Sequence, residues 1–318
     1  MTGDRAGILL MVAASFVFAV QDGISKYLSS AYGVPPIVML RYVFLALFVT
    51  WLVGRRRGGL RRALATRRPL LQIGRGVLLA LEINVAVLAF VLLGLAEAHA
   101  IFACYPLLLA LFAGPILGER VGPRRWAAIA AGFLGVLIVL RPGAGVFSPY
   151  ALIPLASATL FALYGLLTRL VARDDPADVS FFWTGWAGLP VAAAMGLWAW
   201  EPIAPADWGW MALLCLTGAL GHFCLIKSYE LAEASTVQPM TFLQLVFATG
   251  IGVTIFAEPL PATTVLGAAI VVAAGIFTLR RSAAAAGAAA GAVTSPIPPR
   301  PGRRPPRRGT GGGCGPSA

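Results

Sequence analysis

The chain has 318 residues, of which 58% are hydrophobic and only 12% charged, and its mean hydropathy is +0.82. A soluble protein carries about twice that charged fraction, so the composition excludes an ordinary water-soluble domain and indicates an integral membrane protein. The net charge is +12, but the arginines lie in short loops and a terminal tail between apolar runs, a distribution typical of membrane topology rather than of a nucleic-acid-binding face.

Ten apolar segments have about the length that a membrane-spanning helix needs. In chain order they are residues 7–27, 36–53, 70–93, 98–117, 126–140, 150–168, 180–200, 208–226, 234–257 and 263–279. The first segment contains Gln21, Asp22 and Lys26, which suit a functional helix better than a cleaved signal peptide, so we expect it to be retained.

The order of features in the first half recurs in the second half. The motif Leu-Ala-Glu-Ala at 95–98 opens an uncharged run that ends at Glu119, and the same motif at 231–234 opens a run that ends at Glu258. Such a repeat sets the architecture. We therefore predict an all-α polytopic membrane protein with two five-helix repeats, at residues 7–141 and 150–281, followed by a disordered Pro/Arg-rich tail at 282–318.

Because each repeat contains an odd number of spans, the second copy must cross the membrane in the opposite sense. Loop charges agree, since Lys and Arg accumulate on the cytoplasmic side. The loop at 54–69 contains seven arginines, whereas its counterpart at 201–207 contains only the acidic residues Glu201 and Asp207. The sequence thus predicts inverted repeats in an inner (plasma) membrane, with both termini in the cytoplasm. The basic tail is expected to lie near the membrane lipids.

Polar residues inside a bilayer are costly and usually mark a pathway. The candidate substrate-binding residues are Glu82, Asn84, Tyr105, His222, Gln244, Asp22 and Arg41. The first five are expected near mid-depth, in one cavity, where desolvation favours the neutral form of Glu82 and would let it exchange a proton.

Structural explanations compete with these roles. Asp22 could form an ion pair with Lys26 or Arg41, and Glu82 could pair with Arg75. Charged residues at helix ends are expected to be solvated near the headgroups; they are Lys227, Glu230, Glu97, Glu233 and His99.

Two further patterns concern helix geometry. Pro106 and Pro239 occupy related early positions of the fourth and ninth spans, and we interpret both as candidate hinges because proline weakens a helix. Ala127, Ala131 and Gly135 form a small-residue ladder on the fifth span, which allows close helix contact either inside the chain or across a homodimer.

No motif indicates a cofactor, a metal or an ATP-driven pump. A nucleotide-binding G-x-x-x-x-G-K-[ST] motif is absent, and the two histidines, His99 and His222, are too few for a typical catalytic zinc site. The four cysteines form no C-x-x-C pair, so neither a disulfide framework nor a metal site is expected.

The chain resembles the drug/metabolite transporter superfamily, EamA type. The resemblance covers residues 7–281 and is carried by the following motifs: Leu-Arg-Tyr at 40–42, Ala-Glu-Ala at the start of spans four and nine, Gly-Glu at 118–119, Ala-Glu at 257–258, Gly-Phe-Leu-Gly at 132–135, and Gly267 with Gly275. The segment 122–143 is similar to the branch that holds riboflavin and S-adenosylmethionine uptake carriers.

This resemblance implies a secondary carrier that moves a small organic metabolite by alternating access, coupled to an ion or proton or working by exchange. Inverted repeats with polar residues at mid-depth suit the same mechanism. Two alternatives remain at this stage: an intramembrane enzyme that uses Glu82, His222 or Asp22, and a non-transporting membrane scaffold that acts through its basic tail.

Overall fold

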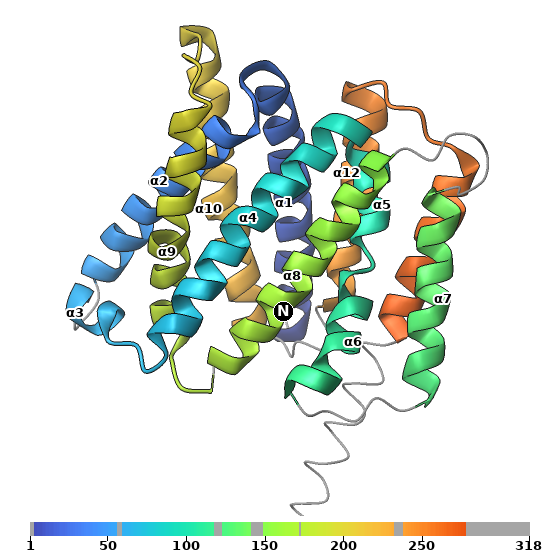
Figure 1. Cartoon of the computed structure of the whole chain (residues 1–318), viewed down its shortest axis with the longest axis horizontal. Helices are drawn as coiled ribbons and strands as arrows, with labels where there is room; N and C mark the ends of the chain where they lie inside the picture. Colours follow the sequence, from blue (N-terminus) through green and yellow to red (C-terminus); the bar gives the residue numbers. More distant parts are fainter. Residues whose placement is uncertain are drawn as a thin grey trace, which may run out of the picture. The chain divides into compact units, whose positions relative to one another are not determined.

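The computed structural model describes residues 3–55, 59–117, 123–140, 149–171, 173–231 and 238–277. The first half of the chain forms α1 (Gly3–Tyr32), α2 (Val34–Gly54), the short α3 (Gly59–Leu64), α4 (Pro69–Leu93), α5 (Leu95–Phe102), α6 (Tyr105–Leu117) and α7 (Pro123–Leu140), as Figure 1 shows. The second half forms η1 (Pro149–Ala151), α8 (Leu152–Val171), α9 (Ala177–Trp198), η2 (Pro205–Asp207), α10 (Trp208–Leu231), η3 (Gln238–Phe242), α12 (Leu243–Ile255) and a C-terminal helix, Ala262–Phe277. The predicted tail at 282–318 lies outside the described residues.

The predicted all-α membrane architecture is confirmed. Within the described residues, five stretches are long and apolar enough to cross a membrane by length and composition, and four shorter apolar helices accompany them. Prolines lie in the first turn of α2 and of α4, where the first backbone N–H groups of a helix have no intrahelical partner and their loss costs little. Glycines at positive φ make the sharp connections before α2 and α5, with φ of 78° at Gly33 and 91° at Gly94.

The fourth and ninth predicted spans are not continuous α-helices. The fourth span divides into α5 and α6 at Ala103 and Cys104, and the ninth contains the 3₁₀ segment η3 before α12. At the first break, Pro106 has no N–H, and the N–H groups of Cys104 and Leu107 bond three residues back instead of four. Both breaks adjoin the predicted hinge prolines, because Pro106 is the second residue of α6 and Pro239 lies within η3.

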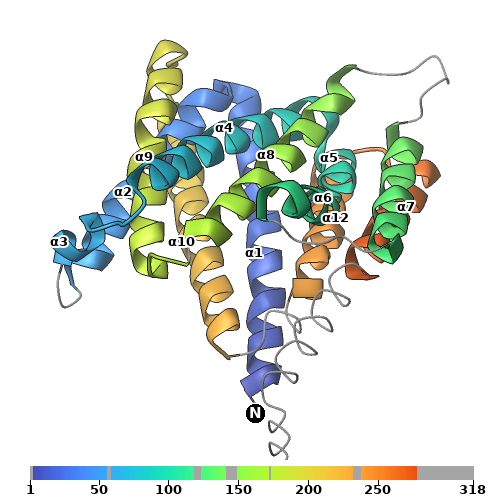
Figure 2. The ribbon, with the colours of Figure 1, turned by 60° about the horizontal axis from the view of Figure 1, so that its bottom comes forward.

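Two pairs of equivalent helices from the two repeats pack against each other and run in opposite directions. Along α2, Met39 lies beside Gly196 of α9, Tyr42 beside Gly188, and Val49 beside Gly185, so one helix ascends as the other descends. In the same way α7 packs on the C-terminal helix, where Gly132 lies near Ala274 and Gly135 near Gly267 (Figures 1 and 2). An antiparallel arrangement of equivalent helices is what inverted repeats require.

The small-residue ladder on α7 makes a contact within the chain. A Cβ at Gly135 would lie 2.8 Å from the Gly267 carbonyl oxygen, so only glycine allows this approach. The apolar groove beside it is lined by Ala127, Ala128, Ala131, Ile270, Ala273, Ala274 and Phe277.

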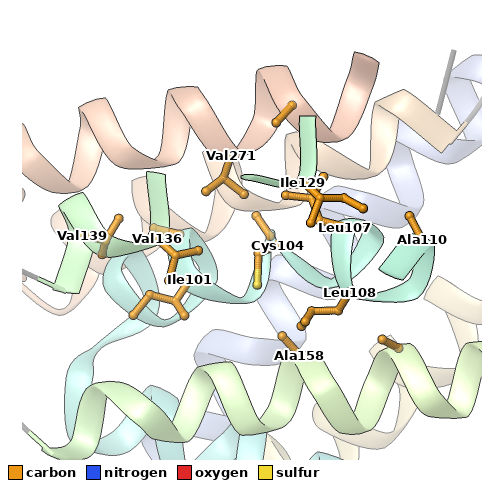
Figure 3. Close-up of a cluster of buried hydrophobic side chains, with 14 of the residues drawn as sticks. Ile101, Cys104, Leu107, Leu108, Ala110, Ile129, Val136, Val139, Ala158 and Val271 are labelled. Atoms are coloured by element: carbon orange, nitrogen blue, oxygen red, sulfur yellow. The ribbon is translucent and has the colours of Figure 1, made fainter. Parts of the chain in front are cut away.

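The largest apolar core joins elements of both repeats. Figure 3 shows Ile101 and Leu107 of the broken fourth span packed with Val136 of α7, Ala158 of α8 and Val271 of the C-terminal helix. This core holds the α5–α6 break in place, since the side chains on both sides of the break contact the second repeat.

Candidate functional site

The buried carboxyl of Glu82 on α4 is held by the second repeat. Its Oε1 accepts a hydrogen bond of 2.7 Å from Ser157 Oγ on α8, and both side chains are buried. The alternative in which Glu82 pairs with Arg75 is wrong. Arg75 lies two turns away on α4 and has a different set of partners.

The Arg75 guanidinium links three helices through neutral oxygen atoms. It donates to Gln72 Oε1 at 3.0 Å on its own helix, to Tyr164 Oη at 3.2 Å on α8, and to Thr184 Oγ1 at 2.8 Å on α9. It also bonds the carbonyl oxygen of Ser180 and lies over the Tyr164 ring. A planar five-donor group suits this fan of acceptors, and Lys could not reproduce it.

Arg41 on α2 is linked electrostatically to two carboxyl groups of the candidate site. It interacts electrostatically with Asp22 and Glu82 and donates a hydrogen bond of 3.3 Å to Ser25 Oγ. His222 on α10 also interacts electrostatically with Arg41, and its ring contacts the rings of Phe18 and Phe181. The His222 side chain is exposed, unlike the buried carboxyl of Glu82. The structure therefore brings Asp22, Arg41, Glu82 and His222 into one electrostatic group.

Tyr105 belongs to an aromatic cluster at the α5–α6 break. Its ring meets Phe161 of α8 edge-on, with centroids 5.0 Å apart, and it contacts Phe102, while its hydroxyl pairs with Thr241 of η3. Phe161 in turn contacts Tyr164, which also receives the Arg75 hydrogen bond. The cluster thus continues from the break toward the polar residues of α4.

Several buried polar atoms on the first repeat have no hydrogen-bond partner among the described residues. Three of them are Asn84 Oδ1 on α4, Tyr42 Oη on α2 and Gln21 Oε1 on α1. The Asn84 amide nitrogen bonds only the Ala80 carbonyl of its own helix. Buried polar atoms are almost always paired with protein, water or ligand, so these three atoms suit a site that binds a polar molecule.

Asp22 is not paired with Lys26, which corrects that alternative. Its Oδ2 accepts a hydrogen bond of 2.8 Å from Gln244 Nε2 on α12 and lies 3.1 Å from His99 Nε2 on α5. His99 is buried, so its expected place among solvated helix-end charges is wrong. Its ring stacks on Phe90, with centroids 4.8 Å apart and 6° between planes.

Lys26 instead forms an ion pair with Glu258, which the sequence interpretation did not assign to the site. Glu258 follows α12 and also accepts hydrogen bonds from the N–H groups of Leu95 at 2.9 Å and Ala96 at 3.1 Å, the first residues of α5. A carboxylate at a helix N-terminus meets free donors and the positive end of the helix dipole. The one signal in the sequence was its place in the repeated acidic motif before the last helix of each repeat.

Among the described residues, no group of three His, Cys, Asp or Glu side chains is placed to hold a metal ion. The groove beside α7 has only apolar side chains around it, so it offers no recognition of a polar molecule. The polar residues described above therefore form the candidate site.

Comparison with known proteins agrees with the two-repeat architecture. The model of the EamA-like transporter family matches residues 5–141 and again residues 148–280. A riboflavin transporter of Rhizobium johnstonii is 30% identical over 277 residues, which are 86% of this chain and 91% of that protein. An S-adenosylmethionine uptake transporter of Rickettsia prowazekii is 26% identical, with 86% of this chain and 92% of that protein covered.

Relatives that move molecules in the other direction are also similar. The pseudopaline exporter CntI of Pseudomonas aeruginosa is 27% identical over 277 residues, which are 86% of this chain and 95% of that protein. A protein of solved crystal structure has the same fold, with a TM-score of 0.55 at 21% identity, over 92% of this chain and 99% of that chain.

Proposed function

Because the chain belongs to the EamA-like transporter family, whose members are transporters and not enzymes, we propose that it is a secondary active carrier of a small organic metabolite. The carrier works by alternating access, with a central polar site that opens in turn to each side of the membrane. Its substrate-binding residues are the sequence candidates Glu82, Asn84, Tyr105, His222, Gln244, Asp22 and Arg41.

One observation carries this proposal: the buried polar contacts join the first repeat to the second. Glu82 bonds Ser157, Arg75 bonds Thr184, and Asp22 bonds Gln244. Rocking of one inverted repeat against the other would break these contacts first, because they lie on the surface between the repeats. A scaffold without transport would gain nothing from polar residues at that position, which cost several kcal/mol in a bilayer.

The chemistry of the site favours a substrate with a planar ring system and hydrogen-bonding groups. Tyr105, Phe161 and Tyr164 offer ring faces and edges for stacking, and the unpartnered Asn84 and Tyr42 oxygens accept or donate hydrogen bonds. Riboflavin and S-adenosylmethionine, named for two relatives, both combine a planar heterocycle with polar substituents. We propose a substrate of that class.

The test is metabolite profiling of a deletion strain against an overexpressing strain, followed by uptake and efflux assays with the metabolites that change. We expect Glu82→Gln and His222→Ala to reduce transport at least tenfold while the protein still inserts, a loss of about 1.4 kcal/mol or more in transition-state free energy. Glu201→Gln in the exposed loop and Phe223→Ala beside His222 on α10, also exposed, are the matched controls and should retain transport. Normal flux in both site variants would remove Glu82 and His222 from the binding site.

The proposed orientation has cytoplasmic termini in the inner membrane, on the evidence of the loop arginines. Single cysteines introduced at the exposed residues Glu201 and Leu60 should report it. A membrane-impermeant maleimide should label position 201 in whole cells and position 60 only after lysis. The opposite labelling pattern would show that the orientation is reversed.

The basic tail separates the carrier from the scaffold alternative. Deletion of residues 283–318 should leave transport intact, whereas loss of function would support the scaffold.

A further inference from the structure

The contacts of the His99 ring determine how many protons the Asp22–His99 pair contains. Nδ1 lies 2.9 Å from the Leu95 carbonyl oxygen, and Nε2 lies 3.1 Å from Asp22 Oδ2. A carbonyl oxygen can only accept, so Nδ1 carries a hydrogen. If Nε2 had no hydrogen and Asp22 were ionised, two lone pairs would face each other. The contact therefore requires one more proton, on Nε2 or on the Asp22 carboxyl group.

Neighbouring elements hold both partners in this geometry. Phe90 of α4 stacks on the imidazole, and Gln244 of α12 donates to the same Oδ2 that faces His99. The pair is buried, with exposed fractions of 9% for Asp22 and 5% for His99. Because both side chains are buried, neither can reorient toward water when the proton leaves. The contact between them therefore has to break.

The charges around the pair come from several helices. Arg41 of α2 and Glu82 of α4 both interact electrostatically with Asp22. On α1 itself, Lys26 lies one turn beyond Asp22 and pairs with Glu258. From α10, Cys215 and His222 interact with Arg41. The pair therefore accepts its proton in the electrostatic field of the Arg41 cation and the Glu82 carboxyl group.

Two successive turns of α1 are linked to α5, the first directly and the second through Glu258. Asp22 contacts His99, and Lys26 reaches the α5 N-terminus through Glu258, which bonds the Leu95 and Ala96 N–H groups. Both links join α1 to α5, the part of the fourth span before its break. If the Asp22–His99 contact opened, the link from Lys26 through Glu258 to the α5 N-terminus would therefore be strained.

We propose that Asp22 and His99 form the proton-binding site of this carrier, and that loss of the shared proton separates α1 from α5. The inference deepens the proposed function and rests on it for the role in transport. One proton is taken up by the ionised carboxylate and neutral imidazole, with no other bond made or broken. Its release leaves the Nε2 lone pair against a carboxylate, and the repulsion opens this junction between α1 and α5.

The first test follows the proton directly. The full chain in lipid bilayers, labelled with ¹⁵N in its two histidines and ¹³C in its aspartates, is titrated by solid-state NMR. We expect one shared step in which His99 Nε2 and the Asp22 carboxyl group change together. Asp22→Asn should abolish the step, because an amide donates to Nε2 without releasing a proton. Asp207→Asn, an equal change on the loop before α10, should keep it.

The second test follows the movement at a fixed pH on the alkaline side of the step. Amide hydrogen exchange of α5 should be about tenfold slower in Asp22→Asn than in the unmodified chain, because the amide keeps the contact with His99 closed. On the acid side the two proteins should exchange equally.

Neither test needs a substrate, so the outcomes separate the two proposals. Two results would overturn the proton site even if transport is found. One is a His99 step that persists in Asp22→Asn, and the other is α5 amide exchange that is identical on both sides of the step. An intact shared step in a protein that transports no metabolite overturns the proposed carrier function and leaves the proton site standing.

Discussion

The Glu258 carboxyl group fills the space that a side chain at Gly94 would occupy. A Cβ at position 94 would lie 2.7 Å from Glu258 Cδ, and one at Gly252 would collide with the same carboxylate. Two glycines thus make room for the one acidic side chain that binds the N-terminus of α5. This relationship joins α5 to the connection between α12 and the C-terminal helix, and so joins the two repeats at one end of the bundle.

Gly94→Ala should therefore be harmful for two reasons. The residue has φ 91° and ψ 166°, a region that essentially only glycine populates and that costs other residues about 1–3 kcal/mol. The added methyl group would also displace Glu258 from the Leu95 and Ala96 N–H groups. We expect a lower unfolding temperature in detergent and reduced transport.

Gly74→Ala on α4 is the matched control, because a Cβ there meets nothing within 4 Å and the helical backbone suits alanine. It should be neutral or slightly stabilising by about 0.5–1 kcal/mol. Equal behaviour of the two alanine variants would show that the Gly94 connection tolerates a side chain, contrary to the geometry.

The Lys26–Glu258 ion pair should give a large coupling energy. Its side chains are only 13% and 9% exposed, so removal of one partner leaves a buried charge, which costs about 3–5 kcal/mol. Lys26→Met should be more damaging than Glu258→Gln, because it leaves a buried carboxylate without its counter-charge, whereas the glutamine amide oxygen can still accept a hydrogen bond from Lys26. In Lys26→Met/Glu258→Gln part of the stability should return. A double-mutant cycle from unfolding measurements tests this, and strict additivity would mean that the pair makes no net contribution.

The sequence was sufficient for the helices and the duplication, because both depend on patterns that a single chain displays. Apolar runs located the spans, and the odd number of spans in each copy implied the antiparallel packing seen between α2 and α9. The break at Ala103 was not predicted as a boundary. The run there is uniformly apolar, and only Pro106 indicated a weakness.

The partners of the charged residues could not be read from the sequence. Spacing along α1 favoured an Asp22–Lys26 pair, but the fold offers each of them a better partner from another helix, His99 and Glu258. Likewise His99 lies near a helix end and was taken for a solvated residue, although α5 is buried against α4, α7, α8 and α12. Such pairings depend on contacts between residues far apart in the chain.

Arg75 provides a test of these tertiary contacts. Its acceptors on α8 and α9 are spaced for a guanidinium fork, so Arg75→Lys should lose at least two hydrogen bonds and leave Thr184 or Tyr164 without its donor. We expect a destabilisation of about 2–3 kcal/mol, measured by thermal unfolding in detergent. Arg61→Lys on α3, whose side chain is exposed, is the control and should change stability by less than about 0.5 kcal/mol. Comparable losses in both variants would contradict the Arg75 network.

The connection between α8 and α9 should make stability sensitive to acid through Asp175. Burial alone would raise the pKa of this carboxyl group, but hydrogen bonds from the Arg67 N–H, Thr66 Oγ1 and Gln72 Nε2 outweigh it, and the pKa lies below its usual range. A carboxyl group with a depressed pKa stabilises the folded state above its unfolded pKa of about 3.8, and this stabilisation is lost as the pH falls through the lower folded value. Asp175→Asn should thus lower stability at neutral pH by about 1–3 kcal/mol and flatten the decline below about pH 4.

The neighbouring Asp174 separates this effect from general surface charge. It pairs with Arg68 at 2.8 Å, but the Arg68 side chain is 55% exposed, and such surface ion pairs contribute about 0–1 kcal/mol. Asp174→Asn should therefore leave both the midpoint of chemical unfolding at neutral pH and its acid dependence nearly unchanged. If instead the two asparagine variants shift the unfolding profile equally, the three hydrogen bonds to Asp175 do not stabilise the fold. The link between the 66–72 segment and the α8–α9 connection would then be weaker than its geometry implies.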